Sequence, residues 1–334
     1  MLAMLLTQPK ERLRLQEVPL PEPQNHEVRL KIFSCGVCRT DLHIADGELP
    51  SVKLPLILGH QIVGRVEKLG KEVSLLHEGE RIGVPWLAKS CGICPYCQKG
   101  EENLCDSAQF TGYTQDGGFA EYALADERYC IPLGEKGEEG QLAPLLCAGL
   151  IGYRSYKLAG AGKRLGLYGF GASAHILAQL AKQMGKELFA FTRPQDVKTQ
   201  AFAKTLGVDW VGGSDEMPPV PLDAALIFAP VGALVPRALQ AVKKGGRVVC
   251  VGIRMSDIPS FPYALLWGER HLLSVANLTR KDGEEFFELI RRFSIQTKIS
   301  LFPLREANEA LDAIRTGSLE GAAVLSICKY TERT

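Results

Sequence analysis

The 334-residue sequence predicts an α/β protein that combines a mostly-β domain with a doubly wound parallel-sheet domain. Three observations favour this fold. Residues 1–150 contain short apolar runs separated by Gly and Pro, strands alternate with amphipathic helices after about residue 160, and a Gly-rich turn joins the first of those strands to its helix. Strands that alternate with helices form parallel sheets covered on both faces. With 46% hydrophobic residues, the chain can bury cores of this kind.

The strands predicted in residues 1–150 are short. The segment "EVRLKIFSCGVC" alternates apolar and polar residues, "ILGHQIVGRVEKLG" indicates a strand around a Gly-marked bend, and "GERIGV" and "GGFAEYALA" indicate further strands. The N-terminal "MLAMLL" is a short apolar run with no small-residue cleavage site behind it. We therefore expect it to be a first strand and not a signal peptide.

From residue 160 the pattern changes to alternating strands and helices. "RLGLYGFGASAHILAQLAKQMG" predicts a strand, a turn and a helix, "ELFAFTR" a second strand, and "QDVKTQAFAKTLG" a helix that stops at Gly207. "DAALIFAP", "LVPRALQAVKKGG" and "RVVCVGI" repeat strand, helix and strand. After "HLLSVANLTR" we expect a helix in "DGEEFFELIRRF", and then short strands with one helix in "EANEALDAIRTG".

Charge and composition exclude several classes of protein. The formal net charge is +1, and no long run of Lys and Arg is present, which argues against nucleic acid or an anionic membrane surface as a partner. No apolar run is long enough to span a bilayer, so we expect a cytoplasmic protein. The chain has 10 cysteines. Because disulfides are rare in the cytoplasm, clustered cysteines indicate metal binding or catalysis.

The Gly-rich turn predicts dinucleotide binding. Gly169, Gly171 and Ala174 have G-x-G-x-x-A spacing, after a strand and at the start of a helix. Gly169 allows a tight turn, Gly171 leaves room for a pyrophosphate, and Ala174 lets helix and strand pack closely. The helix N-terminus favours the phosphate charge. The alternative is an ordinary tight turn between a strand and a helix.

The end of the second strand indicates which coenzyme binds. NAD sites usually have Asp or Glu here for the ribose hydroxyls, whereas this chain has Thr192 and Arg193. A guanidinium can hold a 2′-phosphate in two charge-assisted hydrogen bonds. We therefore expect NADP(H) to be favoured over NAD(H), unless Arg193 is a solvated loop residue.

Further polar residues suggest a second metal site. One His and two Cys from distant segments, Cys38, His60 and Cys147, could form a three-ligand catalytic zinc site with an open fourth position. Each also has an ordinary explanation as a core residue. Cys35 and Cys38 could instead be a C-x-x-C redox pair.

The sequence resembles the zinc-dependent medium-chain alcohol dehydrogenases almost end to end. "CGVCRTDLH", "LPLILGHQIVGRV", "CGICPYCQKGEENLC", "GGFAEYALA", "APLLCAGLIGYRSYK", "GLYGFGASAH" and "GAAVL" follow the family's order. The resemblance implies a GroES-like catalytic domain in residues 1–150 and 293–334, and a Rossmann domain in residues 151–292. It also implies a small-molecule alcohol or aldehyde substrate and a homo-oligomer, either dimer or tetramer.

The resemblance implies two zinc ions per chain. Cys38, His60 and Cys147 match the ligands of the catalytic zinc. The lobe at about residues 91–105 matches the structural zinc site, whose four ligands fill every tetrahedral position; they are Cys91, Cys94, Cys97 and Cys105. A nucleic-acid-binding zinc ribbon is the alternative for this lobe, but it normally needs two separated cysteine pairs and a basic surface.

Other residues match the family's proton path and pocket. Thr40 stands where a hydroxyl touches the substrate oxygen, and His43 matches the outer member of the proton relay. Asp41 matches a carboxylate that steadies the zinc-binding His. Trp86 matches an aromatic wall of the substrate pocket, although a core Trp is the alternative.

Two positions depart from the family pattern. Gln61 replaces the Glu that usually follows the zinc-binding His, and Ala322 replaces an Arg that touches the coenzyme pyrophosphate. His175 is one candidate to compensate for the missing charge.

The expected activity is hydride transfer between an alcohol and a nicotinamide coenzyme. Two rival functions are open at this point: a zinc-free type of superfamily reductase that acts on conjugated C=C bonds, and a non-enzymatic coenzyme sensor. A metal count discriminates the first, and an activity screen the second.

Overall fold

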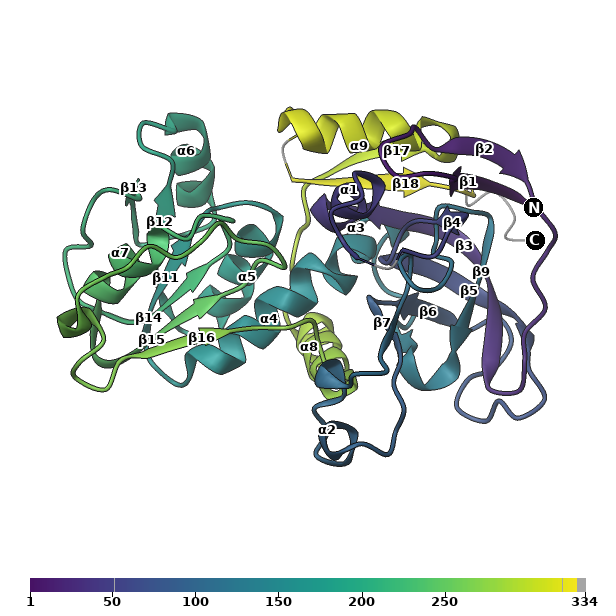
Figure 1. The fold of residues 1–334 in the computed structure, drawn as a ribbon, viewed down its shortest axis with the longest axis horizontal. Coiled ribbons are helices and arrows are strands. Elements are labelled where there is room, and N and C mark those ends of the chain that lie inside the picture. The colour runs from purple at the N-terminus through teal and green to yellow at the C-terminus, as the bar shows by residue number, and fades with distance from the viewer. Residues whose placement is uncertain (51, 320, 329–334) are drawn as a thin grey trace. The chain divides into compact units, whose positions relative to one another are not determined.

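The computed structural model describes residues 1–50, 52–319 and 321–328, and the chain divides into two compact units (Figure 1). The first unit contains Met1–Cys147, Asn277–Phe287 and Gln296–Thr334, and the second contains Ala148–Ala276 and Glu288–Ile295. The domain limits expected from the sequence, at residues 150 and 293, remain a prediction.

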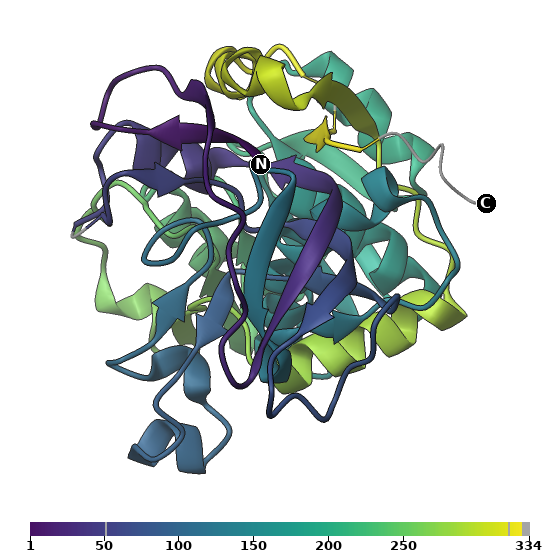
Figure 2. The ribbon, with the colours of Figure 1, turned by 90° about the vertical axis from the view of Figure 1, so that its right-hand side faces the viewer.

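The first unit is built on a mixed sheet with strand order β10-β6-β5-β3-β18-β17, in which β9 also pairs with β3. Its strands are β3 (Glu27–Val37), β5 (Ile62–Leu69), β6 (Arg81–Val84), β9 (Tyr122–Asp126), β10 (Ile131–Pro132), β17 (Ile299–Pro303) and β18 (Ala322–Ser326). The long strand β3, purple in Figure 2, pairs antiparallel with β5, β9 and β18. Its alternate residues Val28, Leu30 and Ile32 are fully buried, as expected for a strand with one face on the core.

Two smaller sheets and several short helices complete this unit. The sheets are β2-β1-β4, with β1 (Leu2–Leu6), β2 (Arg14–Glu17) and β4 (Leu56–Ile57), and β7-β8, with β7 (Leu87–Lys89) and β8 (Gln109–Phe110). The α-helices are α1 (Arg39–Ala45), α2 (Pro95–Gln98), α3 (Glu139–Leu142) and α9 (Ala307–Thr316). The 3₁₀ helices are η1 (Glu102–Leu104), η2 (Glu127–Tyr129), η3 (Ala143–Leu146) and η5 (Leu304–Glu306).

The second unit is a parallel sheet with strand order β13-β12-β11-β14-β15-β16. Its strands are β11 (Arg164–Tyr168), β12 (Glu187–Thr192), β13 (Trp210–Gly213), β14 (Leu222–Ile227), β15 (Val242–Cys250) and β16 (His271–Ser274). Its helices are α4 (Ala148–Ala159), α5 (Ala172–Gln183), α6 (Val197–Thr205), α7 (Leu234–Ala241) and η4 (Tyr263–Leu265), and α8 (Arg280–Arg292) belongs partly to each unit.

Both faces of the parallel sheet are buried. Leu188 and Ala190 of β12 pack in one apolar cluster with Leu177 of α5, and Phe191 of the same strand packs in another with Leu239 of α7. This two-sided burial explains why the strands are nearly continuous apolar runs. The strand order reverses between β11 and β14, and sheets of this kind bind ligands at the carboxyl edge beside such a reversal.

The α/β class predicted from the sequence is confirmed: a mostly-β unit and a doubly wound parallel sheet. The sequence pattern missed β13, whose residues Trp210–Gly213 are too few to show a period. Among the described residues, no helix has both the length and the apolar character needed to cross a membrane.

Candidate metal and coenzyme sites

Helix α1 begins at a residue that is also a candidate metal ligand. Cys38 is the N-cap, and its Sγ accepts from Thr40 N at 3.4 Å. In return, Cys38 N donates to Asp41 Oδ2 at 2.8 Å. This is a capping box with a thiol in place of the usual hydroxyl. The same Asp41 places Oδ1 at 3.2 Å from His60 Nδ1, an ion-pair distance without hydrogen-bond alignment.

Cys38, His60 and Cys147 converge in the first unit. Their ligand atoms all lie within 4.8 Å of one another, and Cys38 Sγ is 3.3 Å from His60 Nε2. His60 precedes β5, after Gly59, which has a φ of +98°. A side chain at Gly59 would collide with Phe119 and with Cys35 Sγ. Cys147 caps the end of η3. Three segments distant in sequence therefore meet at one point, where His60 is buried and the two cysteines are partly buried.

The donor atoms of this cluster fit a bound zinc ion, although without metal the surroundings keep them protonated. The pKa of the Cys38 thiol is raised well above its usual range by the hydrogen bond with Cys147 and by burial. Burial lowers the pKa of His60, but Asp41 and Cys38 together raise it to about 10. A zinc ion would hold the thiols as thiolates and the imidazole as neutral, and two S and one N are a common zinc donor set. The residues fit a three-ligand zinc site.

Four more thiols converge in a lobe that stands out from the first unit in Figures 1 and 2. The Sγ atoms of Cys91, Cys94, Cys97 and Cys105 lie within 4.8 Å of one another. The pKa of Cys91 is lowered to about 6 by the backbone N–H groups of Ile93 and Cys94. Four sulfurs with backbone donors fit a closed tetrahedral zinc site, which leaves no position for substrate.

A chain of contacts ties both ends of this lobe to the start of α8. Cys97 Sγ lies 3.3 Å from Ser90 Oγ, which lies 2.7 Å from Tyr129 Oη. The Arg280 guanidinium stacks over the Tyr129 ring at 5.3 Å. Arg280 also donates from N and Nε to the buried Glu102 Oε1, at 2.9 and 3.0 Å. Sequence reasoning missed this network because Arg280 is far along the chain.

The predicted coenzyme turn lies at the carboxyl end of β11, beside the reversal in strand order. Gly169 has a φ of +87°, and a side chain there would press on Ala229. Gly171 caps α5 without a side-chain hydrogen bond and faces open space. Ala174 is fully buried. The turn therefore leaves the N-terminus of α5 open to an anion, as pyrophosphate binding requires.

At the end of β12, the structure separates the two residues expected to bind the ribose. Thr192 is buried, and its hydroxyl donates to Arg193 O at 2.9 Å and accepts from Gln200 Nε2 at 3.1 Å. The Thr192 hydroxyl proton is therefore already used within the protein. Arg193 is exposed, so its guanidinium is accessible to a ligand.

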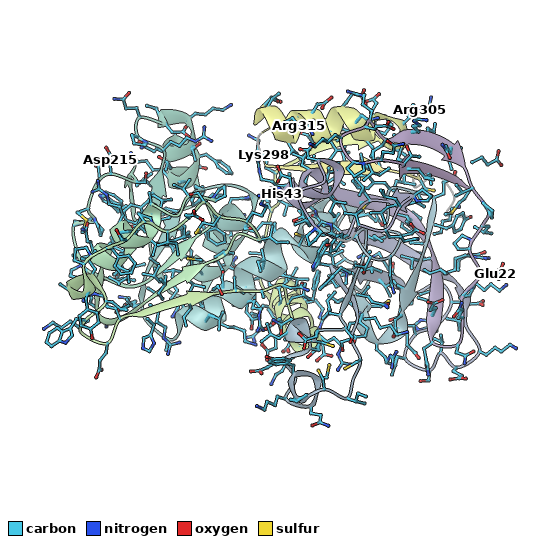
Figure 3. All side chains as sticks on the ribbon, in the orientation of Figure 1. Glu22, His43, Asp215, Lys298, Arg305 and Arg315 are labelled. Atoms are coloured by element: carbon cyan, nitrogen blue, oxygen red, sulfur yellow. The ribbon has the colours of Figure 1, made fainter. Side chains whose placement is uncertain are left out.

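Two acids missed by sequence reasoning stand beside this strand end. Gly213 of β13 is the register partner of Thr192. Glu216 Oε1 accepts from Gly213 N at 2.5 Å, and the carboxylate of Asp215 (labelled in Figure 3) lies against Gly213. Only the order of the strands brings these acids next to β12, so no pattern near Arg193 could have revealed them.

The remaining predicted residues lie around the Cys38 cluster. Thr40 and His43 both come from α1 and are partly buried. Trp86 meets the His60 ring edge-on at 4.9 Å and stacks on Phe110 at 5.1 Å and on Tyr113 at 5.7 Å. The tryptophan thus belongs to an aromatic stack beside a candidate ligand, and its role as a wall of the substrate pocket stays a prediction.

The two departures from the family pattern are both buried. Gln61 is 2% exposed and packs against Gly36, and its Nε2 has no hydrogen-bond partner among the described residues. Ala322 lies in β18, and its N donates to Lys298 O at 2.8 Å. Burial lowers the pKa of His175, which disfavours the protonated ring; its proposed compensation for the missing Arg stays a prediction. Lys298, which directly precedes β17, is a cation close to Ala322 along the backbone pairing.

Comparisons with known proteins agree with this architecture. Residues 24–135 match the alcohol dehydrogenase GroES-like domain family. The chain is 42% identical over 329 residues to a probable alcohol dehydrogenase of Mycobacterium tuberculosis, covering 96% of this chain and 94% of the relative. It is 35% identical over 347 residues to an alcohol dehydrogenase of Geobacillus stearothermophilus, covering 98% and 100%.

Solved structures show the same fold. The alcohol dehydrogenase of Aeropyrum pernix superposes with a TM-score of 0.86 at 27% identity, covering 98% of this chain and 100% of that one. Identity over nearly the whole chain, together with the shared fold and the two Cys-rich clusters, fixes the family. The chain belongs to the zinc-dependent medium-chain alcohol dehydrogenases.

Proposed function

We propose that this chain oxidises alcohols and reduces aldehydes with NADP(H) in preference to NAD(H). Its family relatives are named alcohol dehydrogenases, which supports the reaction class. The observation that carries the proposal is the convergence of the ligand atoms of Cys38, His60 and Cys147 within 4.8 Å of one another. Asp41 behind His60 supports the same interpretation, since carboxylates commonly orient metal-binding imidazoles.

The two proposed metals have different roles. Zinc at Cys38, His60 and Cys147 would supply a Lewis acid for the substrate oxygen, while the nicotinamide would exchange the hydride. The four lobe cysteines would hold a second zinc that only stabilises the fold. Asp41 orients His60, and Trp86 with its stacked neighbours forms a flat apolar wall beside it. Thr40 and His43 move the hydroxyl proton toward solvent.

The proposed coenzyme preference depends on opposing charges. Arg193 is exposed and can pair with a 2′-phosphate. Asp215, on the neighbouring strand end, repels the same group. Arg193 extends from the strand that ends at the expected ribose position, so we propose that its attraction dominates. A cytoplasmic location and a homo-oligomeric state remain predictions.

Metal analysis and kinetics test the proposal. We expect two zinc ions per chain, and turnover of an alcohol panel that is faster with NADP than with NAD. Arg193→Ala should lower kcat/KM with NADP by roughly tenfold to a hundredfold, the value of one charge-assisted contact, and change NAD little. Asp215→Asn should raise the preference for NADP. A wild type that prefers NAD, or an Arg193→Ala variant that weakens both coenzymes equally, would contradict the proposed preference.

A further inference from the structure

The carboxylate of Glu48 contacts a ring nitrogen of His43. Helix α1 ends at Ala45, and the following turn hydrogen-bonds back to it, with Glu48 N donating to His43 O at 2.8 Å. The same turn places Glu48 Oε2 at 2.6 Å from His43 Nδ1. The side chain of His43 is 17% exposed and that of Glu48 is 40% exposed. The ring is therefore largely covered, while the carboxylate that it contacts reaches solvent.

Other charged groups near this helix are engaged elsewhere. Asp41 accepts from Cys38 N and faces His60. Asp46 pairs with Arg315 of α9, the helix that packs on α1, at 2.6 Å; Figure 3 labels both His43 and Arg315. Arg39 donates to Ile314 O at 3.5 Å. Within the described residues, Glu48 is the carboxylate that contacts the His43 ring.

The contact determines which ring nitrogen can accept a proton. An ionised carboxylate accepts hydrogen bonds only, so Nδ1 must carry the proton that joins it to Glu48. The neutral ring then has Nε2 unprotonated, and the hydrogen bond of one nitrogen sets the state of the other. A histidine held in this form can take a proton at Nε2 without first changing tautomer.

We propose that Glu48 is a positioning residue that holds His43 in the Nδ1–H tautomer and passes the transferred proton to solvent. During alcohol oxidation, Nε2 accepts a proton and the ring becomes imidazolium. The Nδ1–H bond then breaks, its proton binds Glu48 Oε2, and the carboxylic acid releases that proton to water. One proton enters and one leaves, and no electrons move; aldehyde reduction reverses the order. The inference rests on the proposed function, in which His43 carries the proton.

A purely structural role for Glu48 predicts different behaviour. A partly exposed ion pair contributes little to stability, so if Glu48 had only this role, its loss should leave catalysis unchanged. A positioning role instead predicts a loss of kcat that a small carboxylate restores. The Glu48 side chain is 40% exposed, so formate can reach the space left when it is truncated.

The kinetic test uses Glu48→Ala, Glu48→Gln and Glu48→Asp in the full, zinc-loaded chain. We expect Glu48→Ala and Glu48→Gln to lower kcat about tenfold, within the usual range for general acid–base groups, with KM almost unchanged. Formate should restore much of the rate of Glu48→Ala, and Glu48→Asp should lose less. Asp46→Asn, the neighbouring acid of the same turn, is the matched control and should keep the wild-type rate. A kcat like that of the control, or a loss that formate does not restore, overturns the proposal.

A second measurement does not depend on turnover. The ¹⁵N shifts of the His43 ring should show the Nδ1–H tautomer in wild type and a mixture in Glu48→Ala. A wild-type ring protonated at Nε2 overturns the proposal even if the kinetics agree.

The variant His43→Gln separates the proposed role of Glu48 from the proposed function on which it rests. If it leaves kcat intact, the proposed role of His43 is wrong; if it lowers kcat while the Glu48 variants do not, only the role of Glu48 is wrong.

Discussion

The two cysteine sites of the first unit hold their ligands in opposite ways. The lobe takes all four thiols from residues 91–105, in and around the short helices α2 and η1, and Ile93 between them is 78% exposed. The other site takes its ligands from α1, the segment before β5 and the end of η3. There, Asp41 and His60 are 0% and 1% exposed.

This difference in burial and in the origin of the ligands matches two different roles, a stabilising metal in the lobe and a reactive metal at Cys38. The lobe buries little apolar surface of its own, so bound metal must provide much of its folding free energy. The Cys38 cluster is embedded in a sheet core that is already well packed, so its fold needs the metal less. The capping hydrogen bonds of Cys38 and the buried Asp41 beside His60 instead hold the ligands in place for one ion.

Removing one ligand from each site should produce the largest effects. Cys94→Ser should abolish metal binding in the lobe and lower Tm by roughly 5–10 °C, because the remaining thiols lose the ion that joins them. Cys38→Ser should abolish alcohol oxidation while changing Tm by only about 2 °C, since α1 can still be capped by a hydroxyl. Metal content, calorimetry and activity of both variants give the comparison. Equal losses of Tm in the two variants would remove the distinction between the sites.

Asp41→Asn should weaken the Cys38 site selectively. The Asp41 carboxylate caps α1 and faces His60 Nδ1. Its replacement by an amide removes the negative charge that orients the imidazole. We expect about 10–100-fold weaker metal binding at this site, the usual cost of losing such a partner, and unchanged metal in the lobe. A chelator titration that resolves the metal of the Cys38 site from that of the lobe measures both affinities. Asp46→Asn is the control, and release of both ions together by Asp41→Asn would contradict independent sites.

Glu102→Gln tests whether the lobe is tied to α8. Glu102 is buried and accepts two hydrogen bonds from Arg280, so losing its charge should cost about 1–2 kcal/mol of unfolding free energy. The cost should shrink in a Cys94→Ser background, because a lobe without metal no longer orders Glu102. Chemical denaturation of the two single variants and the double variant gives the coupling. If the losses of unfolding free energy are strictly additive, the lobe metal and the Glu102–Arg280 contact act separately.

The contrast between the sites also decides what the sequence alone could predict. The lobe was visible because its four ligands are neighbours in the chain with a specific spacing. Cys38, His60 and Cys147 are separated by long segments, so residue spacing left their grouping open and only the family resemblance joined them. The alternating pattern predicted the parallel sheet, but β13 is too short to show it.

What escaped prediction comes from contacts between segments distant in sequence or from a turn. Asp215 reaches the end of β12 through the register of β13. Arg280 meets Glu102 only because α8 packs beside the lobe. Glu48 is close to His43 in sequence, yet the pair depends on how the chain turns after α1. The periodicity of apolar residues predicts helices and strands but not the path of such a turn.

The smallest expected effect concerns the hydroxyls behind the lobe. Ser90 Oγ touches Cys97 Sγ, and Tyr129 Oη touches Ser90 Oγ and accepts from Ser90 N. Ser90→Ala should release the lobe metal to a chelator about tenfold faster, because a hydroxyl next to a ligand sulfur stabilises its thiolate.

Tyr129→Phe acts one contact further away and should accelerate release about threefold, because Ser90 keeps its hydroxyl but loses the partner that fixes its direction. Tyr122→Phe, on β9 in the same unit, is the matched control and should release metal at the wild-type rate. The Arg280 guanidinium also packs on the Tyr129 ring. Because phenylalanine keeps that ring contact, Tyr129→Phe tests the hydroxyl alone. If Tyr129→Phe releases metal as fast as Ser90→Ala, the ring and not the hydrogen-bond chain supports the lobe. If neither variant differs from the control, the thiols and their backbone donors hold the ion alone.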